Sequence, residues 1–305
     1  MEMAGATDTA DTAEDVSDRS LVFPGWLEAR LIPDSRFARA YDSLGDSGRG
    51  LLKRLIAAHF ALNPPAPALV STRLDVLRGG LSLATDAAPR TWAVVLCDGG
   101  LDAPAFLLPA LVPALCSGVA EVLVARLGAA KGISGATLAA CELAGQERVA
   151  ALDVRHTEAL LAHLAQSGQP GVVIHADTPA IRKLFSRPGL APLLDCPDVW
   201  RVALPMPARC GLWRDGPDDF PSDTLARLYG GLAFEEAAAG QDFESFAPAR
   251  RELLLVPDGR VGQLFQAAEQ GARVIVSVSQ LGLWDWRQIS PEVFLLRSSV
   301  YSSER

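Results

Sequence analysis

Short apolar runs alternate with longer helix-forming segments through the middle of the chain. The run 92–97 (WAVVLC) is followed by a polar break at 98–102 (DGGLD) and then by a long apolar segment. A second apolar run, 121–125 (EVLVA), begins after Gly118. Strand, glycine loop, helix and strand in this order form a parallel βαβ unit. The pattern therefore predicts a parallel sheet whose first crossover lies between residues 92 and 125.

The same alternation continues along the chain to residue 185. The predicted elements are a helix within 130–145, a strand at 148–152, a helix at 156–167, a strand at 171–175 and a helix through 185. Thr178 and Pro179 are suited to begin the last of these helices. An alternation of this length predicts an α/β fold with a parallel sheet and helices on both faces.

The flanking regions have a different character. Residues 46–62 have helical spacing, and residues 66–88 are predicted to continue as helical and turn structure. Proline and aspartate become frequent after residue 186. The elements predicted from there are strands at 199–204, 252–256, 273–278 and 293–296, and helices at 222–238 and 261–271. They predict a second, smaller α/β lobe.

These patterns divide the chain into three regions. Residues 1–20 are acidic and lack the basic and apolar parts of a signal peptide, so a disordered tail is predicted. Residues 21–190 are predicted to form the domain with the parallel sheet, together with N-terminal helices. Residues 191–305 are predicted to form the smaller lobe.

The loop that contains Asp98, Gly99 and Gly100 is the first place to expect a small-molecule site. In parallel sheets, ligands bind where the carboxyl ends of the strands meet loops and helix N-termini. The loop has no GxGxxG pattern and no Walker lysine, so a phosphate cradle is weakly specified. Its two aspartates would also repel a phosphate unless they point away.

The amino-acid composition argues against some classes of binding partner. The chain has 305 residues, of which 49% are hydrophobic, so it can bury a large core. Its net charge of −8, without a Lys/Arg cluster, argues against nucleic acid and anionic membrane. Residues 103–120 are uncharged and long enough to span a membrane. Their prolines and the lack of basic flanks favour a buried crossover helix instead.

The five cysteines are widely spaced and form no CxxC motif or Cys/His pair. A zinc cluster is therefore not expected. Cysteines scattered in apolar settings are typical of buried residues in a reducing compartment, which predicts a cytoplasmic protein. His156 and His163 lie near one helix face, but no third ligand accompanies them, so no metal site is predicted.

Residues 91–185 resemble the cofactor-binding domain of the aldehyde dehydrogenase superfamily, which includes the fatty acyl-CoA reductases and histidinol dehydrogenase. VVLCDGGLDAPAFLLPALVPALCSGVAEVLVAR is similar to the family's first strand, loop, helix and second strand. ISGATLAACELAGQERVAAL resembles its next helix and strand, and GVVIHADTPAIRKLF resembles the strand and helix of its "FTGS" turn. In the C-terminal lobe, GQDFESFAPARRELLLV is similar to the segment around the family's catalytic cysteine.

The resemblance implies that residues 21–190 form a Rossmann-like domain that binds NAD or NADP and that the smaller lobe, 191–305, is of the catalytic type. It also implies an oxidoreductase acting on an aldehyde or acyl thioester. It places Arg126 where the family has a lysine that contacts the adenosine ribose. The cofactor-binding residues that it implies are Asp98, Gly99, Gly100, Arg126, Ala176, Asp177 and Thr178.

The catalytic lobe departs from the family. Ser245 stands at the position of the nucleophilic cysteine, and no adjacent base is evident. The family's Glu-Gly-Gly motif is missing, and Cys210 would substitute for the nucleophile only in a rearranged lobe. A catalytically inactive relative that serves as a binding or partner module is therefore the alternative to an active oxidoreductase. An unrelated doubly wound protein that binds a nucleotide or another anion is the third hypothesis. A small-molecule substrate and a homo-oligomer or partner enzyme are compatible with each of the three.

Overall fold

The computed structural model describes residues 22–65, 70–78, 80–129, 132–247, 249, 251–263 and 272–303. The predicted tail 1–20 and most of the predicted helix 261–271 lie outside these residues. A five-stranded parallel sheet in the order β5-β4-β3-β6-β7 forms the centre of the larger lobe. Its strands are β3 Trp92–Cys97, β4 Glu121–Leu127, β5 Val149–Leu152, β6 Gly171–Ala176 and β7 Val199–Leu204.

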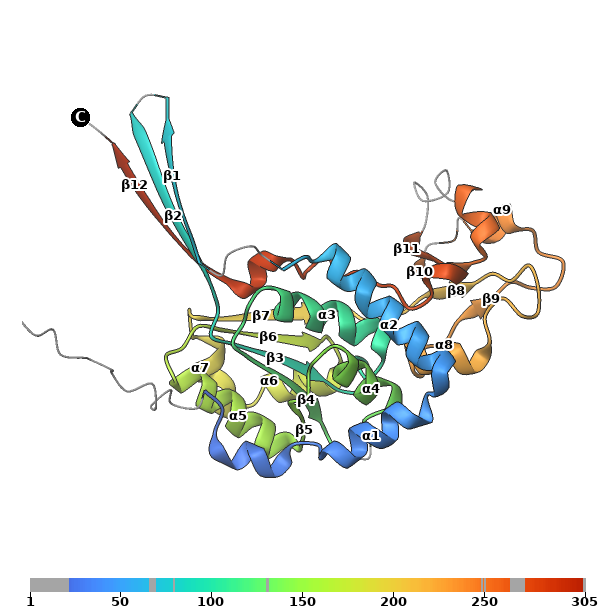
Figure 1. Cartoon of the computed structure of the whole chain (residues 1–305), viewed down its shortest axis with the longest axis horizontal. Coiled ribbons are helices and arrows are strands. Elements are labelled where there is room, and N and C mark those ends of the chain that lie inside the picture. Colours follow the sequence, from blue (N-terminus) through green and yellow to red (C-terminus); the bar gives the residue numbers. More distant parts are fainter. Residues whose placement is uncertain are drawn as a thin grey trace, which may run out of the picture.

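Helices cover both faces of this sheet, as the alternating pattern predicts (Figure 1). On one face lie α1 Asp34–Ser43, α2 Gly45–Leu62, α3 Pro104–Cys116 and α4 Gly135–Leu143. On the other lie α5 Val154–Gln166, α6 Pro179–Phe185 and α7 Ala191–Leu194. Short 3-10 helices occupy Gly25–Arg30, Pro188–Leu190, Asp258–Arg260, Val278–Gln280 and Pro291–Phe294.

The strand β3 shows why helices must pack on both faces of the sheet. Successive side chains of a strand point to opposite faces. Val95 packs in the cluster that includes α3, whereas Val94 and Leu96 pack in the cluster that includes α5 and α6. All six residues of β3 are buried. A strand that is apolar on both faces is typical of the parallel sheets of doubly wound folds.

The helix α3 is apolar all round because it is enclosed. It packs against α2, α4 and α8 (Ser222–Tyr229), and twelve of its thirteen residues are buried. The expected crossover helix is thus confirmed. Among the described residues, no helix combines the length and apolar character that crossing a membrane would need.

The sequence predicts the smaller α/β lobe, and the structure shows that it contains a second parallel sheet in the order β11-β10-β8-β9. Its elements are β8 Cys210–Leu212, β9 Glu235–Glu236, α9 Phe243–Phe246, β10 Arg251–Val256 and β11 Ala272–Ser277. The predicted helix 222–238 is too long. It ends at Tyr229 because Gly230 adopts a φ of 62°, which closes the helix. The first sheet includes β7, so it continues past residue 190, where the sequence predicts a boundary.

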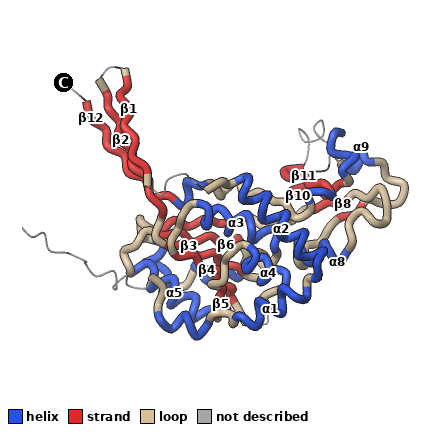
Figure 2. The backbone as a smooth tube through the Cα atoms, viewed as in Figure 1, coloured by secondary structure: helices blue, strands red, loops and turns tan. Residues whose placement is uncertain are grey.

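A third, antiparallel sheet projects from the body of the molecule (Figures 1 and 2). It consists of β1 Ser71–Leu77, β2 Leu81–Pro89 and β12 Leu295–Ser303 in the order β1-β2-β12. We call this sheet the arm. The helical structure predicted within 66–88 is wrong, because residues 71–77 and 81–88 lie in strands, whereas residues 78 and 80 are in a turn. The predicted strand 293–296 is also corrected, because β12 begins at Leu295 and runs to Ser303.

Candidate functional site

The order of strands defines one special crevice in the larger sheet. From β3 the chain proceeds to β4 and β5 on one side, then returns to β6 and β7 on the other. The direction of winding therefore reverses between β3 and β6. In open α/β sheets, ligands bind outside the carboxyl ends of the strands at such a switch point. The segments that meet there are the loop after β3 and the turn after β6, both singled out from the sequence.

Hydrogen bonds join these two segments. The Gly100 N–H donates to Asp98 Oδ1 at 2.9 Å, and the Thr178 hydroxyl donates to Asp98 Oδ2. A Cβ at Gly100 would lie 3.2 Å from Asp98 Oδ1, 3.2 Å from Thr178 Cγ2 and 3.3 Å from Met206 Cγ. The loop therefore packs closely against the ends of β6 and β7, and a residue larger than glycine at position 100 would push them apart.

Gly99 has the opposite environment. It is exposed, and no heavy atom lies within 4 Å of the place where its Cβ would sit. The backbone at the tip of the loop thus faces open space beside the switch point. A ligand could approach this backbone without displacing a side chain.

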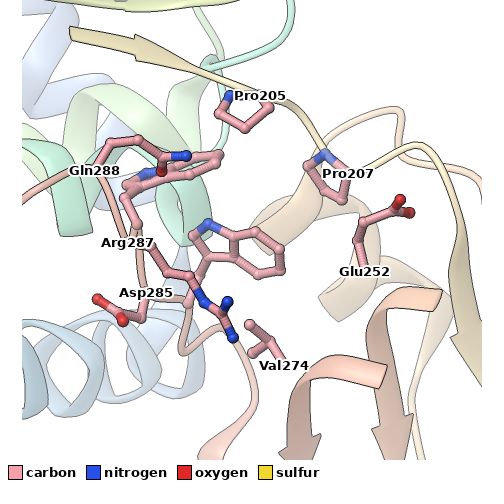
Figure 3. Close-up of a pocket in the computed structure, with 9 residues that line it drawn as sticks. Pro205, Pro207, Glu252, Val274, Asp285, Arg287 and Gln288 are labelled. Atoms are coloured by element: carbon pink, nitrogen blue, oxygen red, sulfur yellow. The ribbon is translucent and has the colours of Figure 1, made fainter. Parts of the chain in front are cut away.

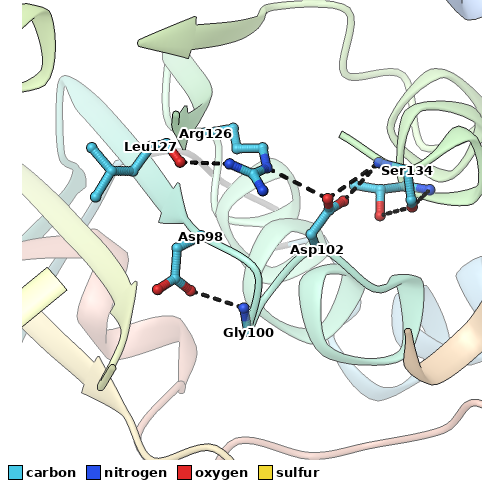
Figure 4. Close-up of polar contacts among 7 residues, drawn as sticks. Asp98, Gly100, Asp102, Arg126, Leu127 and Ser134 are labelled. Carbon is cyan, nitrogen blue, oxygen red and sulfur yellow. Dashed lines mark hydrogen bonds and ion pairs between the residues drawn. The ribbon is translucent and has the colours of Figure 1, made fainter. Parts of the chain in front are cut away.

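Arg126, at the end of β4, is engaged by the protein itself (Figure 4). Its Nη1 donates to the Leu127 carbonyl oxygen at 2.5 Å, and its Nε lies 3.5 Å from Asp102 Oδ2. The guanidinium fits between Gly128 and Gly132, where a Cβ would approach its nitrogens to 2.9 Å. Only 14% of the Arg126 side chain is exposed. A ligand would therefore compete with these internal contacts for the guanidinium.

Asp102 links the first loop to the next helix. Its two carboxylate oxygens accept the Ser134 N–H at 3.1 and 3.2 Å (Figure 4). Ser134 in turn caps α4 by accepting the Thr137 N–H. The two aspartates of the loop thus accept hydrogen bonds from the protein, which offsets their charge and reduces the repulsion expected from the sequence.

The turn after β6 presents Asp177 to solvent. Its N–H donates to the Leu204 carbonyl at 2.8 Å, and its carboxylate forms a 3.2 Å ion pair with Arg182. Ala176 is fully buried, so its side chain is not available to a ligand. Thr178 caps α6 as predicted, by accepting the Ile181 N–H.

The N-terminus of α3 is covered by the smaller lobe. Ala103 and Pro104, where the helix begins, are buried. A Cβ on Gly230, directly after α8, would lie 3.6 Å from Ala103 Cβ and from the Asp102 carbonyl oxygen. Phosphate binding at this helix end, the usual arrangement in dinucleotide-binding folds, would require that cover to move.

The structure does not bring Ser245 to the switch point. Ser245 lies on α9, which Figure 1 shows at the outer end of the smaller lobe, away from β3 and β6. Its N–H donates to Asp242 Oδ1 at 2.7 Å and its hydroxyl to the Asp242 carbonyl at 3.0 Å. The hydroxyl is thus held by a backbone acceptor at the start of a short helix.

Cys210 lies on β8 and is 3% exposed. Desolvation by burial, followed by the nearby Glu252 carboxylate, raises the pKa of its thiol to about 12. The thiolate, which is the nucleophilic form, is therefore strongly disfavoured near neutral pH.

A small hollow of about 50 Å³ separates the two lobes beside the end of β7 (Figure 3). Pro205 and Pro207 line it from the larger lobe, and Glu252 and Val274 from the smaller one. The segment that returns to the arm provides the remaining wall through Trp284, Asp285, Trp286, Arg287 and Gln288. Met206, between the two prolines, reaches Gly100, so the hollow and the switch point are neighbours. Sequence reasoning missed these residues, although the WDW motif at 284–286 was a visible signal.

In the described part of the chain, no group of three or more His, Cys, Asp or Glu side chains could hold a metal ion. His156 instead contacts Asp153 on its own helix turn, at 2.9 Å, and Arg30 at 3.0 Å.

Comparison of the sequence with family models and with curated proteins finds no match. Comparison of the fold with solved structures finds histidinol dehydrogenase from Elizabethkingia anophelis, with a TM-score of 0.53 and 8% identity over 90% of this chain and 77% of that chain. The chain shares the fold of histidinol dehydrogenase. That enzyme belongs to the superfamily that the sequence resembles.

Two further solved structures have lower scores. An aldehyde dehydrogenase from Brucella melitensis biovar abortus 2308 has a TM-score of 0.46 and 11% identity over 89% of this chain and 83% of that chain. A succinate-semialdehyde dehydrogenase from Burkholderia pseudomallei has a TM-score of 0.42 and 10% identity over 84% of this chain and 77% of that chain.

The residues at the switch point are better suited to bind the ribose groups of a nicotinamide dinucleotide than its phosphate groups. The exposed carboxylate of Asp177 can accept ribose hydroxyl groups, whereas Asp98 is buried and both of its oxygens accept hydrogen bonds within the protein. The exposed backbone at Gly99 can approach a pyrophosphate. Arg126 and the N-terminus of α3, the two features that usually favour phosphate, are already occupied by contacts within the protein.

Proposed function

We propose that this protein binds NAD or NADP at the switch point between β3 and β6, as a divergent relative of the aldehyde dehydrogenase and acyl-CoA reductase oxidoreductases. The observation that carries the proposal is the meeting of the Asp98–Gly100 loop and Thr178 at the reversal of strand order. A bound nicotinamide would supply hydride transfer. The protein would hold the nucleotide through the Gly99 backbone and the exposed carboxylate of Asp177, while Asp98 fixes the loop against Thr178.

NAD fits this site better than NADP. The extra 2′-phosphate of NADP needs a cation, and Arg126 is committed to Asp102 and Leu127. We therefore expect NADH to bind more tightly than NADPH.

The alternative, a relative without the family's covalent chemistry, is favoured by specific observations in the smaller lobe. Ser245 is remote from the switch point, and Cys210 is a buried thiol with a raised pKa. Neither residue is placed to attack a substrate carbonyl beside the nucleotide. The fold can persist as a nucleotide-binding or partner module after such a loss, because fold and site are separable. The cytoplasmic location stays a prediction.

Titration of the protein with NADH, followed by nicotinamide fluorescence, tests the proposed site. Gly99→Trp would fill the open space at the loop tip and is expected to weaken NADH binding at least tenfold. Gly99→Ala should bind normally, because nothing lies within 4 Å of the added Cβ. Gly50→Trp on α2 is a matched control, since that position is equally open. Unchanged NADH binding by Gly99→Trp would contradict the proposed site.

A turnover assay distinguishes an active oxidoreductase from a catalytically inactive binding or partner module. NADH oxidation is followed in the presence of an aldehyde or a fatty acyl-CoA, for the wild type, Ser245→Ala and Cys210→Ala. Binding of NADH without turnover supports the hypothesis of an inactive binding or partner module. Turnover that survives both substitutions supports an oxidoreductase that works without the family's nucleophile. Turnover that either substitution abolishes would contradict our placement of the chemistry.

A further inference from the structure

The hollow between the two lobes has an apolar floor. Pro207, Trp284 and Trp286 line it, and all three residues are buried. Val274 adds a branched aliphatic side chain from the smaller lobe. The indole N–H of Trp286 already donates to the Phe106 carbonyl, and Trp284 Nε1 is buried. The floor therefore offers a ligand apolar contacts rather than hydrogen bonds.

The mouth of the hollow is polar and includes a cation. Arg287 and Gln288 line the hollow, and both residues are exposed. Within the described part of the chain, no hydrogen bond or ion pair involves the side chain of Arg287. A guanidinium presents its N–H donors in a planar fork that matches the two oxygens of a carboxylate. Arg287 is therefore available to bind such a group.

Two acidic side chains also line the hollow, and neither forms an ion pair with Arg287 in the part of the chain that the structure describes. Glu252 Oε2 accepts the Arg209 N–H at 2.7 Å, and its Oε1 lies 3.7 Å from Arg209 Nη2, so its charge is offset by another arginine. In Figure 3 the Arg287 guanidinium points toward Val274, whereas the Asp285 carboxylate points to the opposite side. The cation at the mouth thus keeps its positive charge for a ligand.

The volume of the hollow limits the size of the apolar part of a ligand. The hollow has about 50 Å³. A water molecule needs roughly 10–15 Å³ of such volume, so the hollow has room for roughly three to five groups of that size. An aliphatic chain of a few carbons fits this space. An aromatic ring, which occupies a cavity of roughly 150 Å³, would not be enclosed.

We propose that the hollow binds a short aliphatic carboxylate. The hydrocarbon chain contacts the proline and indole rings of the floor, and the carboxylate is bound by Arg287 at the mouth. The side-chain amide of Gln288 can donate to the same carboxylate. This inference does not depend on the proposed nucleotide site. Because Met206 connects the hollow to Gly100, a bound acid would lie next to the loop after β3.

Titration of the full chain with butyrate and with butyramide, without nucleotide and followed by tryptophan fluorescence, tests the role of the charge. The two ligands have nearly the same shape, and only butyrate is charged. The wild type should bind butyrate about tenfold or more tightly than butyramide. Arg287→Gln should remove this preference by weakening butyrate alone. Arg155→Gln, at an exposed position of α5, is the matched control and should bind butyrate normally. Equal binding of the two ligands by the wild type, or butyrate binding that Arg287→Gln leaves unchanged, would overturn the proposal.

A series of acids from acetate to octanoate tests the apolar floor and its size. Affinity should rise about fourfold for each added methylene while the chain still fits the hollow. It should level off after the first few carbons, because a longer chain extends beyond the hollow. An affinity that does not depend on chain length would contradict the apolar contacts. A rise that continues through octanoate would contradict a hollow of this volume.

Filling the hollow tests its location. Val274→Phe should weaken butyrate binding about tenfold or more, because the ring takes the place of the hydrocarbon chain. Val76→Phe, at an exposed position of β1, is the matched control and should bind butyrate normally. Circular dichroism checks that both variants are folded. Arg287→Gln changes an exposed side chain, so the charge test stays decisive if Val274→Phe folds poorly. Normal butyrate binding by a folded Val274→Phe variant would refute the location.

Discussion

Trp92 occupies the space where a side chain at position 171 would lie. The two residues are partners across β3 and β6, and a Cβ on Gly171 would lie 1.9 Å from Trp92 Cε2. Trp92 is fully buried, and its Nε1 donates to the Gln169 carbonyl at 3.1 Å. The indole therefore has little freedom to move away.

We expect Gly171→Ala to lower the free energy of unfolding by about 3 kcal/mol, the upper range for overpacking a core. Urea unfolding followed by tryptophan fluorescence measures this change. Gly99→Ala is the control, because its Cβ meets nothing within 4 Å and should leave stability nearly unchanged. Equal stability of the two variants would show that Trp92 can move aside.

A buried histidine on α2 makes stability depend on pH. His59 is 1% exposed, and its Nε2 has no hydrogen-bond partner among the described residues. Desolvation by burial lowers its pKa from 6.5 to about 4. Between these pH values the unfolded chain binds a proton that the folded protein excludes. The stability that the neutral histidine confers is therefore complete above pH 6.5 and is lost as pH falls toward 4.

From this shift, the wild type should lose about 2 kcal/mol of unfolding free energy between about pH 7 and pH 5 through His59 alone. His59→Leu should remove that part of the loss. The His59→Leu substitution should change the free energy of unfolding little near neutral pH, since no hydrogen bond of Nε2 is broken. Urea titrations at both pH values measure the difference, with the exposed His163→Leu as control. A slope that His59→Leu leaves unchanged would refute this assignment.

At the scale of elements, burial decides what can be predicted. The sequence predicts β3, β4 and β6 correctly because they are buried on both faces and bounded by glycine or aspartate turns. It does not reveal β1 and β2, because the arm is largely exposed and no buried face imposes a clear alternation on their residues. β2 also pairs with β12 from the far end of the sequence, which local patterns cannot reveal.

The candidate site is also predictable only in part, at the residues that local sequence signals mark. The loop after β3 and the turn after β6 can be found because strand ends and turn residues are local signals. Their joining by Thr178 and Asp98 follows from the parallel order of the strands. Met206, Gly230 and the tryptophans of the hollow cannot be found in this way, because they reach the site through packing between lobes. The position of Ser245 away from the switch point also requires the structure.

The start of α4 provides a test at this scale. The Ser134 hydroxyl accepts the Thr137 N–H at 3.0 Å, while the Ser134 N–H donates to Asp102. Ser134→Ala should lower the free energy of unfolding by about 1 kcal/mol through loss of the cap. Ser134→Asn should recover most of it. Ser186→Ala, whose exposed hydroxyl contacts Lys183, is the control. Chemical denaturation distinguishes these variants, and a neutral Ser134→Ala would argue against the cap.

At the scale of the whole molecule, aromatic residues connect the lobes. Trp286, on the segment that returns to the arm, donates from Nε1 to the Phe106 carbonyl of α3 at 2.9 Å. Phe106 also has edge contacts with Tyr229 of α8 and with Trp284. Tyr229 accepts the Gly282 N–H at 3.0 Å. This group forms one core between the larger lobe, the smaller lobe and the returning segment.

Trp286→Phe removes the hydrogen bond to the Phe106 carbonyl and part of a buried aromatic side chain. We expect it to lower the unfolding free energy by about 2 kcal/mol. Amide hydrogen exchange should show faster exchange in α3 and α8 and little change in α5. Trp26→Phe, at a position 37% exposed, is the control. Uniform acceleration across the protein would contradict a role at the junction of the lobes.

The strands of the arm come from distant parts of the sequence, and this has a consequence for its biosynthesis. Arg90, directly after β2, donates to the carbonyl of Val293, 203 residues further along, just before β12. A ribosome releases β1 and β2 long before β12 exists, and a two-stranded hairpin is marginally stable on its own. The arm is therefore completed only late in translation. Until each chain has been made through residue 303, β2 would lack the strand that completes the arm.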